Sequence, residues 1–383
     1  MGSTGRILGQ DHLSLSEKVR LVSWPFLLLI TMVASVGFLS LYSAAGGSFE
    51  PWAGKQIGRF LIGMCGLMVV AMIDIRVWFR LAYPLYILCL LMLVYVDIRG
   101  HIGMGAQRWI NLGFMQLQPS EVMKIASVLV LARFFHGSTP EDVRSPVFLL
   151  QVVALVAVPV ILVMVQPDLG TAITLILGAV VIFFLAGISY WIFIGGAAAA
   201  VAFLPVAWHL LHDYQKRRVL VFLNPDLDPL GAGYHITQSK IALGSGGIFG
   251  KGFLNGSQSR LNFLPEKQTD FIFTLFTEEW GMMGGVLLLL LFTAVIVYGY
   301  VIAMSCQSQF SRLLAIGIVS NFFIYAFINM GMVMGLLPVV GVPLPMISYG
   351  GTAMLAVLFG FGLLMSAYVH RDIKITRRGM DLA

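Results

Sequence analysis

The chain of 383 residues is strongly apolar: 58% of its residues are hydrophobic and only 11% are charged, with a mean hydropathy of +0.90. This composition excludes an ordinary soluble domain and predicts an integral membrane protein. Apolar segments recur from Trp24 to Tyr368, so they are not one secretory signal peptide. The net charge of +6 is spread over short flanks and one long loop. We therefore expect membrane orientation and an anionic, membrane-borne ligand to explain it, and no nucleic acid.

Apolar runs of about 20 residues mark the expected membrane-spanning helices. The sequence predicts an all-α polytopic membrane protein with about ten of them, in a domain over residues 23–370 between tails at 1–22 and 371–383. The expected spans are 24–43, 57–74, 77–97, 120–135, 148–166, 170–187, 189–211, 271–303, 312–335 and 349–369.

Short basic segments predict the orientation of these helices. Arg and Lys occur in the N-terminal tail, after the second and fourth spans, and in the C-terminal tail. This alternation predicts that both termini are cytoplasmic. Residues 99–119 and the long loop 212–269, between the seventh and eighth spans, then lie outside.

The long outer loop has a composition unlike that of a disordered segment. Its stretch "HITQSKIAL" predicts a short amphipathic helix along the outer membrane surface. Glycines at 244, 246, 247, 250 and 252 permit tight turns or a close approach to a ligand. The seven His and three Cys show no metal-ligand spacing, so no dedicated metal site is expected.

Charged residues at membrane depth are candidates for function because burying them in lipid is costly. In "QPSEVMK", Glu121 and Lys124 share a helix face and can pair, either as a structural ion pair or in contact with a ligand. In "QPDLGT", Asp168 can cap the helix that follows Pro167.

The stretch "FLPEKQTDFIFTLFTEEWG" carries carboxylates where the chain re-enters the membrane. Thr269 or Asp270 can cap the eighth span, but Asp270 also lies close to a basic outer loop, where it could act chemically. Glu278 and Glu279, two turns deeper, could line a cavity or pair with basic residues of other spans.

Three prolines prevent a regular helix in "LLPVVGVPLPMISYGGT", residues 336–352. Non-helical backbone at membrane depth must be buried in protein or line a wet cavity. We expect a rigid segment beneath the outer loops, with Ser348 and Tyr349 as its polar side chains.

Several of these stretches together resemble the SEDS family of bacterial cell-wall synthesis. They are "RWINLGFMQLQPSEVMK", "QPDLGTA", "YQKRRVLVFLNPDLDPLGAGYHITQSKIALGSGGIFGKG", "FLPEKQTDFIF" and "NMGMVMGLLPVVGVPLPMISYGGT". "PVVGVPLPMISYGG" is similar to the elongation members rather than the division members. The resemblance implies ten helices and a peptidoglycan glycosyltransferase that polymerises lipid II and polyprenyl-diphosphate-linked glycan during rod-shaped growth, at the outer face of the bacterial cytoplasmic (inner) membrane. It also implies as partners a class B penicillin-binding protein and other membrane proteins of the elongation complex.

The family's functional residues map onto matching positions of this sequence. Its essential loop aspartate corresponds to Asp270, its outer-loop tryptophan to Trp109, and its carboxylate and lysine at the fourth helix to Glu121 and Lys124. Gln268 departs from the His found in many members, which leaves no imidazole beside the aspartate.

The implied reaction joins a sugar hydroxyl to an anomeric carbon that carries a polyprenyl diphosphate. Asp270 would act as general base in a single inverting displacement, with Glu266 and Lys267 beside it as substrate-binding neighbours. The diphosphate requires positive charge, for which the candidates are Arg108, Lys124, Arg217, Arg218 and Lys240. No cofactor is evident, although a divalent cation (Mg or Mn) could accompany the diphosphate.

Two other classes of function compete with this interpretation. A flippase for lipid II would use charges at membrane depth equally well, but it needs a polar path through the midplane. A scaffold for a penicillin-binding protein would need Asp270 only as a helix cap.

Overall fold

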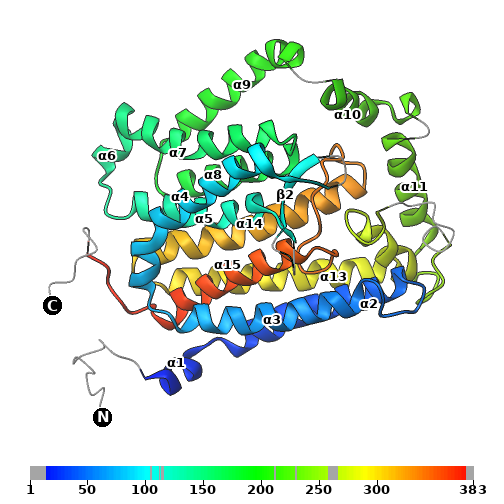
Figure 1. The fold of residues 1–383 in the computed structure, drawn as a ribbon, viewed down its shortest axis with the longest axis horizontal. Helices are drawn as coiled ribbons and strands as arrows, with labels where there is room; N and C mark the ends of the chain where they lie inside the picture. Colours follow the sequence, from blue (N-terminus) through cyan, green and yellow to red (C-terminus); the bar gives the residue numbers. More distant parts are fainter. Residues whose placement is uncertain are drawn as a thin grey trace.

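The computed structural model describes residues 14–103, 106–111, 113, 116–210, 213–228, 231–257 and 266–376. Over these residues the chain forms a bundle of long, roughly parallel and antiparallel helices, as Figure 1 shows. Seven of the described helices are long and apolar enough to cross a membrane, and the shorter apolar helices include Leu169–Leu185. The prediction of an all-α polytopic membrane protein is confirmed.

The ten expected spans correspond to ten helices whose ends differ from the predicted ones by a few residues. They are α2 (Trp24–Ala44), α3 (Ala53–Met72), α4 (Ile75–Arg99), α5 (Pro119–Phe135), α7 (Pro146–Val165), α8 (Leu169–Leu185), α9 (Tyr190–Leu210), α13 (Ile272–Ser305), α14 (Gln309–Val333) and α15 (Gly351–Val369). Shorter helices are α1 (Leu15–Leu21), α6 (Pro140–Arg144), α10 (Asp213–Leu223), the 3-10 turn η1 (Pro225–Leu227) and α11 (Ala232–Ser245).

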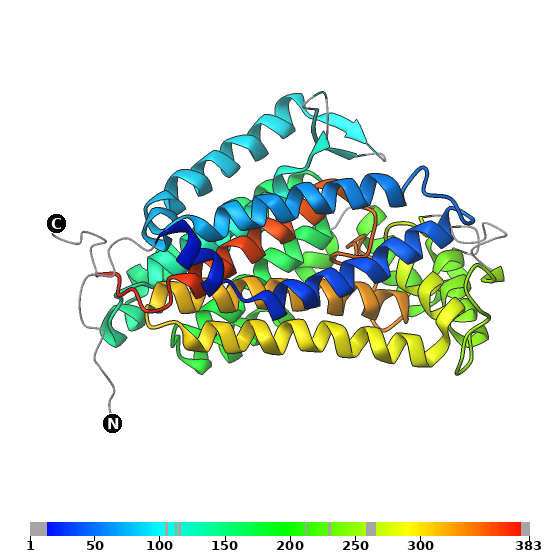
Figure 2. The ribbon, with the colours of Figure 1, turned by 90° about the horizontal axis from the view of Figure 1, so that it is seen from below.

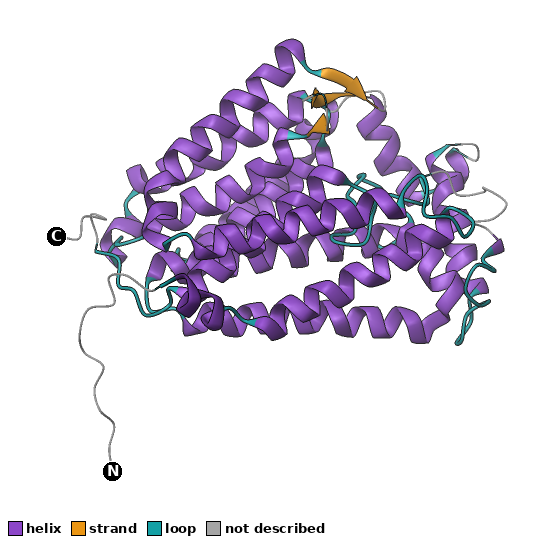
Figure 3. Ribbon diagram, turned by 60° about the horizontal axis from the view of Figure 1, so that its bottom comes forward, coloured by secondary structure: helices purple, strands orange, loops and turns teal. Residues whose placement is uncertain are grey.

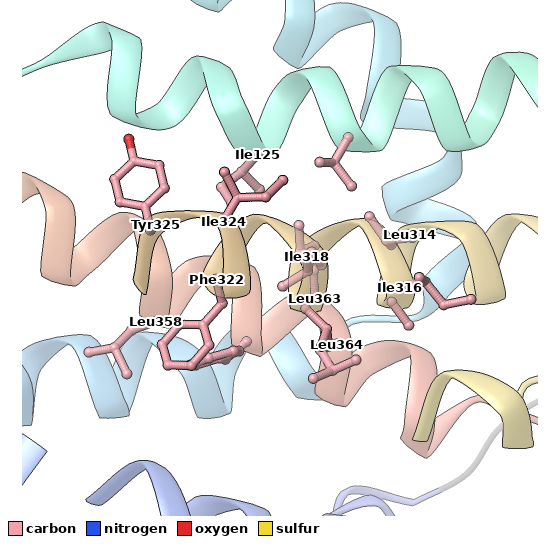
Figure 4. Packing of buried hydrophobic residues seen from close by; sticks show 14 of the residues in the cluster. Ile125, Leu314, Ile316, Ile318, Phe322, Ile324, Tyr325, Leu358, Leu363 and Leu364 are labelled. Atoms are coloured by element: carbon pink, nitrogen blue, oxygen red, sulfur yellow. The ribbon is translucent and has the colours of Figure 1, made fainter. Parts of the chain in front are cut away.

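Helices α5 and α14 form the centre of the bundle. Most of their residues are buried, whereas α7 and α9 expose apolar side chains over much of their length, as helices in contact with lipid do. Figure 4 shows Ile318 and Phe322 of α14 packed between α5 and α15, close to Ile125 and Leu358. This packing fixes α14, whose Asn329 contacts the segments before α13 and α15.

The beginning and the end of the described chain lie at the same end of the bundle. In Figures 1 and 2, α1 and the last turn of α15 are at one end, while α11 and the segment before α13 are at the other. This placement agrees with an even number of crossings between the two.

Two elements in the segments expected to lie outside were not predicted. Residues between α4 and α5 form a small antiparallel sheet of β1 (His101–Gly103), β2 (Ala106–Asn111) and β3 (Gln116–Leu117), in the order β1-β2-β3, visible above the bundle in Figure 3. The long loop contains α10, which the apolar pattern did not reveal. Neither contains the long apolar run that marks a membrane-spanning helix, because the strands are short and α10 is polar.

Helix α11 contains the predicted "HITQSKIAL" helix, but it packs on protein. Its Ile236, Ser239 and Ala242 are buried, and the Ser239 hydroxyl contacts Thr274 Oγ1 at 2.7 Å and donates to the Val333 carbonyl at 2.9 Å. This face therefore contacts α13 and α14, and the position of the helix along the membrane surface stays a prediction.

The glycine-rich segment after α11 approaches α13 at a kink. Gly281 adopts φ +67° inside α13, and a Cβ there would lie 2.3 Å from the Gly250 nitrogen. Backbone bonds from Lys251 N to Glu278 O and from Met282 N to Gly247 O, at 3.0 and 2.9 Å, replace helix bonds lost at the kink. The close approach that the glycines permit is thus to the chain's own helix.

We expect Gly250→Ala to destabilise the protein by at least about 1 kcal/mol. Gly250 has φ +79° and a Cβ there would lie 2.1 Å from the Glu279 carbonyl oxygen, so alanine meets both left-handed strain and a backbone clash. Thermal unfolding in detergent would measure the loss. The matched control is Gly244→Ala, whose Cβ has open space, and an equal loss in both variants would contradict the explanation.

Candidate functional site

The end of the bundle opposite α1 holds a cleft of about 360 Å³, bounded by residues far apart in sequence. Its walls come from β2, the starts of α5, α8 and α15, helices α10 and α14, and the segment before α13. The lining residues are Arg108, Trp109, Gln118, Glu121, Asp168, Thr171, Arg218, Glu266, Thr269, Asp270, Tyr325, Val340, Gly341, Val342, Pro343, Tyr349, Gly350, Gly351, Thr352 and Ala353.

Asp270 faces this cleft and does not cap α13. The N-cap of α13 is Phe271, and no side chain caps it, so the expectation of a cap at Thr269 or Asp270 is wrong. Burial raises the pKa of Asp270 to about 6, with the Glu266 carboxylate adding to the rise and the Arg218 guanidinium opposing it. A carboxyl group with this pKa is mostly ionised at neutral pH and can take up a proton.

Arg108 joins the sheet to the start of α8. Its Nε donates to the Gln166 carbonyl at 2.9 Å, another nitrogen donates to the Pro167 carbonyl, and Nη1 lies 3.8 Å from Asp168 Oδ1. Strand β2 thereby carries both Arg108 and Trp109 to the cleft wall.

Asp168 caps α8, as the sequence predicts. Its Oδ1 accepts from the Thr171 amide at 3.3 Å and its Oδ2 accepts from the Thr171 hydroxyl at 2.9 Å. Gln118 at the start of α5 donates to the same carboxylate at 3.2 Å. Asp168 therefore both caps α8 and forms part of the cleft wall.

Glu121 and Lys124 form the predicted ion pair. Lys124 Nζ lies 2.7 Å from Glu121 Oε1 and 3.5 Å from the centre of the Tyr325 ring, while the Tyr325 hydroxyl donates to Glu121 at 3.2 Å. Both charged side chains are about 95% buried. Glu121 and Tyr325 reach the cleft, whereas Lys124 points below it, between α5 and α14.

Three other predicted substrate-binding residues lie away from the cleft lining. Arg217 is 68% exposed and pairs with Asp228 at 3.0 Å. Lys240 lies over Gly335, just after α14, and Lys267 is adjacent in sequence to the lining residue Glu266 but does not line the cleft. The cationic side chains that line the cleft are Arg108 and Arg218.

Glu278 and Glu279 are buried but contribute nothing to the cleft wall. Glu278 Oε1 lies 2.7 Å from Lys251 Nζ and accepts from Ser257 at 3.1 Å, and Glu279 accepts from Ser43. They tie the outer loop and α2 to the kink in α13, so of the two roles left open, pairing is the one observed. The cation, however, comes from the loop and not from another span.

The proline-containing segment before α15 is non-helical, as predicted. It runs beneath the cleft and supplies Val340–Pro343 and Tyr349–Gly350 to the lining. Ser348 is buried under this surface, where its hydroxyl accepts from the Leu344 amide at 2.8 Å and donates to the Thr269 carbonyl at 2.6 Å.

Four helices begin at the cleft. These are α5, α8, α13 and α15, of which only α8 has a side-chain cap. Free amide groups and the helix dipole make such helix starts favourable for anions. Their convergence next to Arg108 and Arg218 places helix starts and two guanidinium groups beside the carboxylates of Glu121, Asp168, Glu266 and Asp270.

Several lining residues escaped the sequence analysis. Gln118, Thr171, Tyr325 and Thr352 line the cleft but carry no charge, so the search for charges at membrane depth passed over them. The local signal was available: Pro119, Asp168 and Gly350 each stand at a helix start, and the residues next to these helix starts include uncharged lining residues.

Within the described ranges no group of three or more His, Cys, Asp or Glu side chains is arranged to hold a metal ion.

Comparison with known proteins identifies the class. Residues 19–373 match the model of the FtsW, RodA and SpoVE family, described as cell cycle proteins. The chain belongs to this family, which is the one the sequence resemblance indicates.

Curated relatives and solved structures agree. The peptidoglycan glycosyltransferase MrdB (RodA) of Escherichia coli K12 is 47% identical over 91% of this chain and 94% of its own length. The probable peptidoglycan glycosyltransferase FtsW of Trichlorobacter lovleyi is 38% identical over 92% and 95%. RodA of Thermus thermophilus superposes with a TM-score of 0.68 at 28% identity, covering 92% of this chain and 97% of its own.

A further solved chain comes from a peptidoglycan synthase complex studied for its coordination of polymerization and crosslinking. It superposes with a TM-score of 0.79 at 31% identity and covers 92% of this chain and 98% of its own. The higher identity to MrdB than to FtsW agrees with the elongation-type features of "PVVGVPLPMISYGG".

We expect Lys124→Met to destabilise the protein by about 3–5 kcal/mol, because it leaves the Glu121 carboxylate buried without its cation. Glu121→Gln together with Lys124→Met should recover most of the loss, since the remaining amide is neutral. Thermal unfolding of the single and double variants measures the coupling. Additive losses would show that the pair is not energetically coupled.

Proposed function

We propose that this protein polymerises lipid II into glycan strands, with Asp270 as the general base that takes the proton from the attacking sugar hydroxyl. The observation that carries the proposal is the position of Asp270: it is a partly desolvated carboxylate without a capping role, in a cleft lined by two arginines and four helix starts. The names of the 47% and 38% identical relatives give the enzyme class, a peptidoglycan glycosyltransferase.

The chemistry follows from the charges of the cleft. A hydroxyl that attacks an anomeric carbon must lose its proton, and a carboxylate with a pKa of about 6 accepts it at neutral pH. The departing diphosphate gains negative charge, which Arg108, Arg218 and the free amides at the start of α15 would stabilise. A single displacement of this kind inverts the anomeric carbon and requires no enzyme nucleophile.

A divalent cation, if the reaction uses one, would arrive with the diphosphate. Mg²⁺ keeps several waters and binds through one or two carboxylates together with substrate phosphates. Asp168 and Glu266 are carboxylates at the cleft wall that could provide such contacts.

The location proposed for the reaction is the outer face of the bacterial cytoplasmic membrane. The protein is a multi-pass membrane protein, and the basic flanks favour cytoplasmic termini, which puts the cleft outside. The solved relative from a synthase complex that coordinates polymerization and crosslinking supports a crosslinking partner, for which we propose a class B penicillin-binding protein. Other membrane proteins of the elongation complex are further proposed partners.

Asp270→Asn should abolish polymerisation without loss of the fold. The amide is nearly isosteric with the carboxylate but cannot accept the proton. Purified protein with its partner would be incubated with labelled lipid II and moenomycin, which blocks penicillin-type transglycosylases, and the products separated on a gel. A glycan ladder from the variant would reject the general-base role, and no ladder from either protein would favour a flippase.

The rate should fall as the pH drops through about 6. Only ionised Asp270 acts as a base, and its pKa of about 6 means that kcat/KM falls about tenfold per pH unit below that value. Initial rates of lipid II consumption between pH 4.5 and 8 give the profile. A flat profile down to pH 5 would contradict the assignment.

A further inference from the structure

The backbone that carries Asp270 is held by an unusual set of hydrogen bonds. The carbonyls of three consecutive residues, Gln268, Thr269 and Asp270, each accept a hydrogen bond from a different donor. The donors lie on α14 and on the segment before α15, so neither belongs to the helix that follows Asp270.

Asn329 of α14 makes the central contact. Its Nδ2 donates to the Asp270 carbonyl at 2.9 Å and to the Val342 carbonyl at 2.7 Å. Because both acceptors are carbonyls, this nitrogen must be the donor end of the amide. One side chain therefore joins the backbone of Asp270 to the backbone of a residue that lines the cleft.

The oxygen of the same amide is buried without a hydrogen-bond donor among the described residues. Asn329 is fully buried, and its Oδ1 has no hydrogen-bond partner among the described residues. A buried acceptor without a partner costs about 1–3 kcal/mol. An apolar residue would avoid that cost but would leave two carbonyls without their donor.

Ser348 and Tyr349 hold the two preceding carbonyls. The Ser348 hydroxyl donates to the Thr269 carbonyl at 2.6 Å, and the Tyr349 amide donates to the Gln268 carbonyl at 2.8 Å. Ser348 is itself fixed, because it accepts from the Leu344 amide at 2.8 Å.

Gly341 completes the arrangement next to the carboxylate. It has φ +72°, and a Cβ there would lie 3.5 Å from Asp270 Oδ2. The segment that Asn329 ties to the Asp270 backbone thus also packs beside the Asp270 carboxylate.

We propose that Asn329 and Ser348 are positioning residues for polymerisation: they hold the Asp270 and Thr269 carbonyls and so direct the Asp270 carboxylate into the cleft. The proposal rests on Asp270 as the general base. Misplacing a catalytic group by about 1 Å can cost about 100-fold in rate, while substrate bound by other walls of the cleft is retained. Loss of positioning therefore lowers kcat more than it raises KM.

The test compares Asn329→Leu with Asn321→Leu. Both asparagines lie on α14, are at least 93% buried and have an Oδ1 without a partner, but Asn321 is eight residues, about 12 Å, farther from the loop. The lipid II assay should give Asn329→Leu a kcat at least tenfold below wild type with KM within about threefold. Asn321→Leu should retain a kcat within about twofold of wild type.

Gel filtration in detergent shows whether Asn329→Leu folds. If it does not, a second pair of variants tests the proposal. Ser348→Ala removes one hydroxyl from the loop, and Ser40→Ala removes one that donates only within α2, to Val36 O. Ser348→Ala should lower kcat at least threefold, and Ser40→Ala should not.

Assaying Asp270→Asn in parallel distinguishes failure of the positioning role from failure of the general-base role. If Asp270→Asn is inactive while Asn329→Leu and Ser348→Ala keep wild-type kcat, the positioning role is rejected and the base survives. If each variant loses as much kcat as its control variant, the positioning role is also rejected. If Asp270→Asn polymerises normally, the proposed function itself fails.

Discussion

The structure depends on one constraint: backbone amides and carbonyls at membrane depth must find partners inside the protein. Regular helices meet it along their length, but the helices of this chain are interrupted at Pro167, at Gly281 and over residues 334–350. Each break requires a replacement for lost helix bonds. These replacements connect elements that are distant in the sequence, and the cleft lies among them.

The kink of α13 and the loop before it illustrate the two kinds of replacement. At Gly281, backbone from the glycine-rich segment substitutes for the missing helix bonds, which demands glycine because the two chains nearly touch. Before α13, side chains of Asn329 and Ser348 satisfy the carbonyls, which demands small polar residues. The first device shapes the helix, and the second fixes the segment that carries Asp270.

The pKa of Asp270 is set by a balance between burial and nearby charges. Burial and Glu266 favour the protonated form of Asp270, while Arg218 favours the ionised form, so the pKa settles near 6. Arg108 lies farther along the wall and is engaged by the carbonyls of Gln166 and Pro167 and by Asp168. The cleft thereby holds a carboxylate that can take up a proton close to two arginines whose guanidinium groups suit a diphosphate.

The sequence by itself determined the membrane class, ten helices to within a few residues, the Glu121–Lys124 pair and the cap at Asp168, because apolar run length and helix spacing act locally. It also singled out Asp270, since a carboxylate at the membrane edge is costly. Only the tertiary structure decided which basic residues share the cleft with it. Arg108 and Arg218 reach the cleft while Arg217 and Lys240 do not, because side-chain direction depends on how β2, α10 and α11 pack. Sequence also left Asn329 unnoticed, since its partners are a loop carbonyl 59 residues earlier and one 13 residues later, and only folding brings them together.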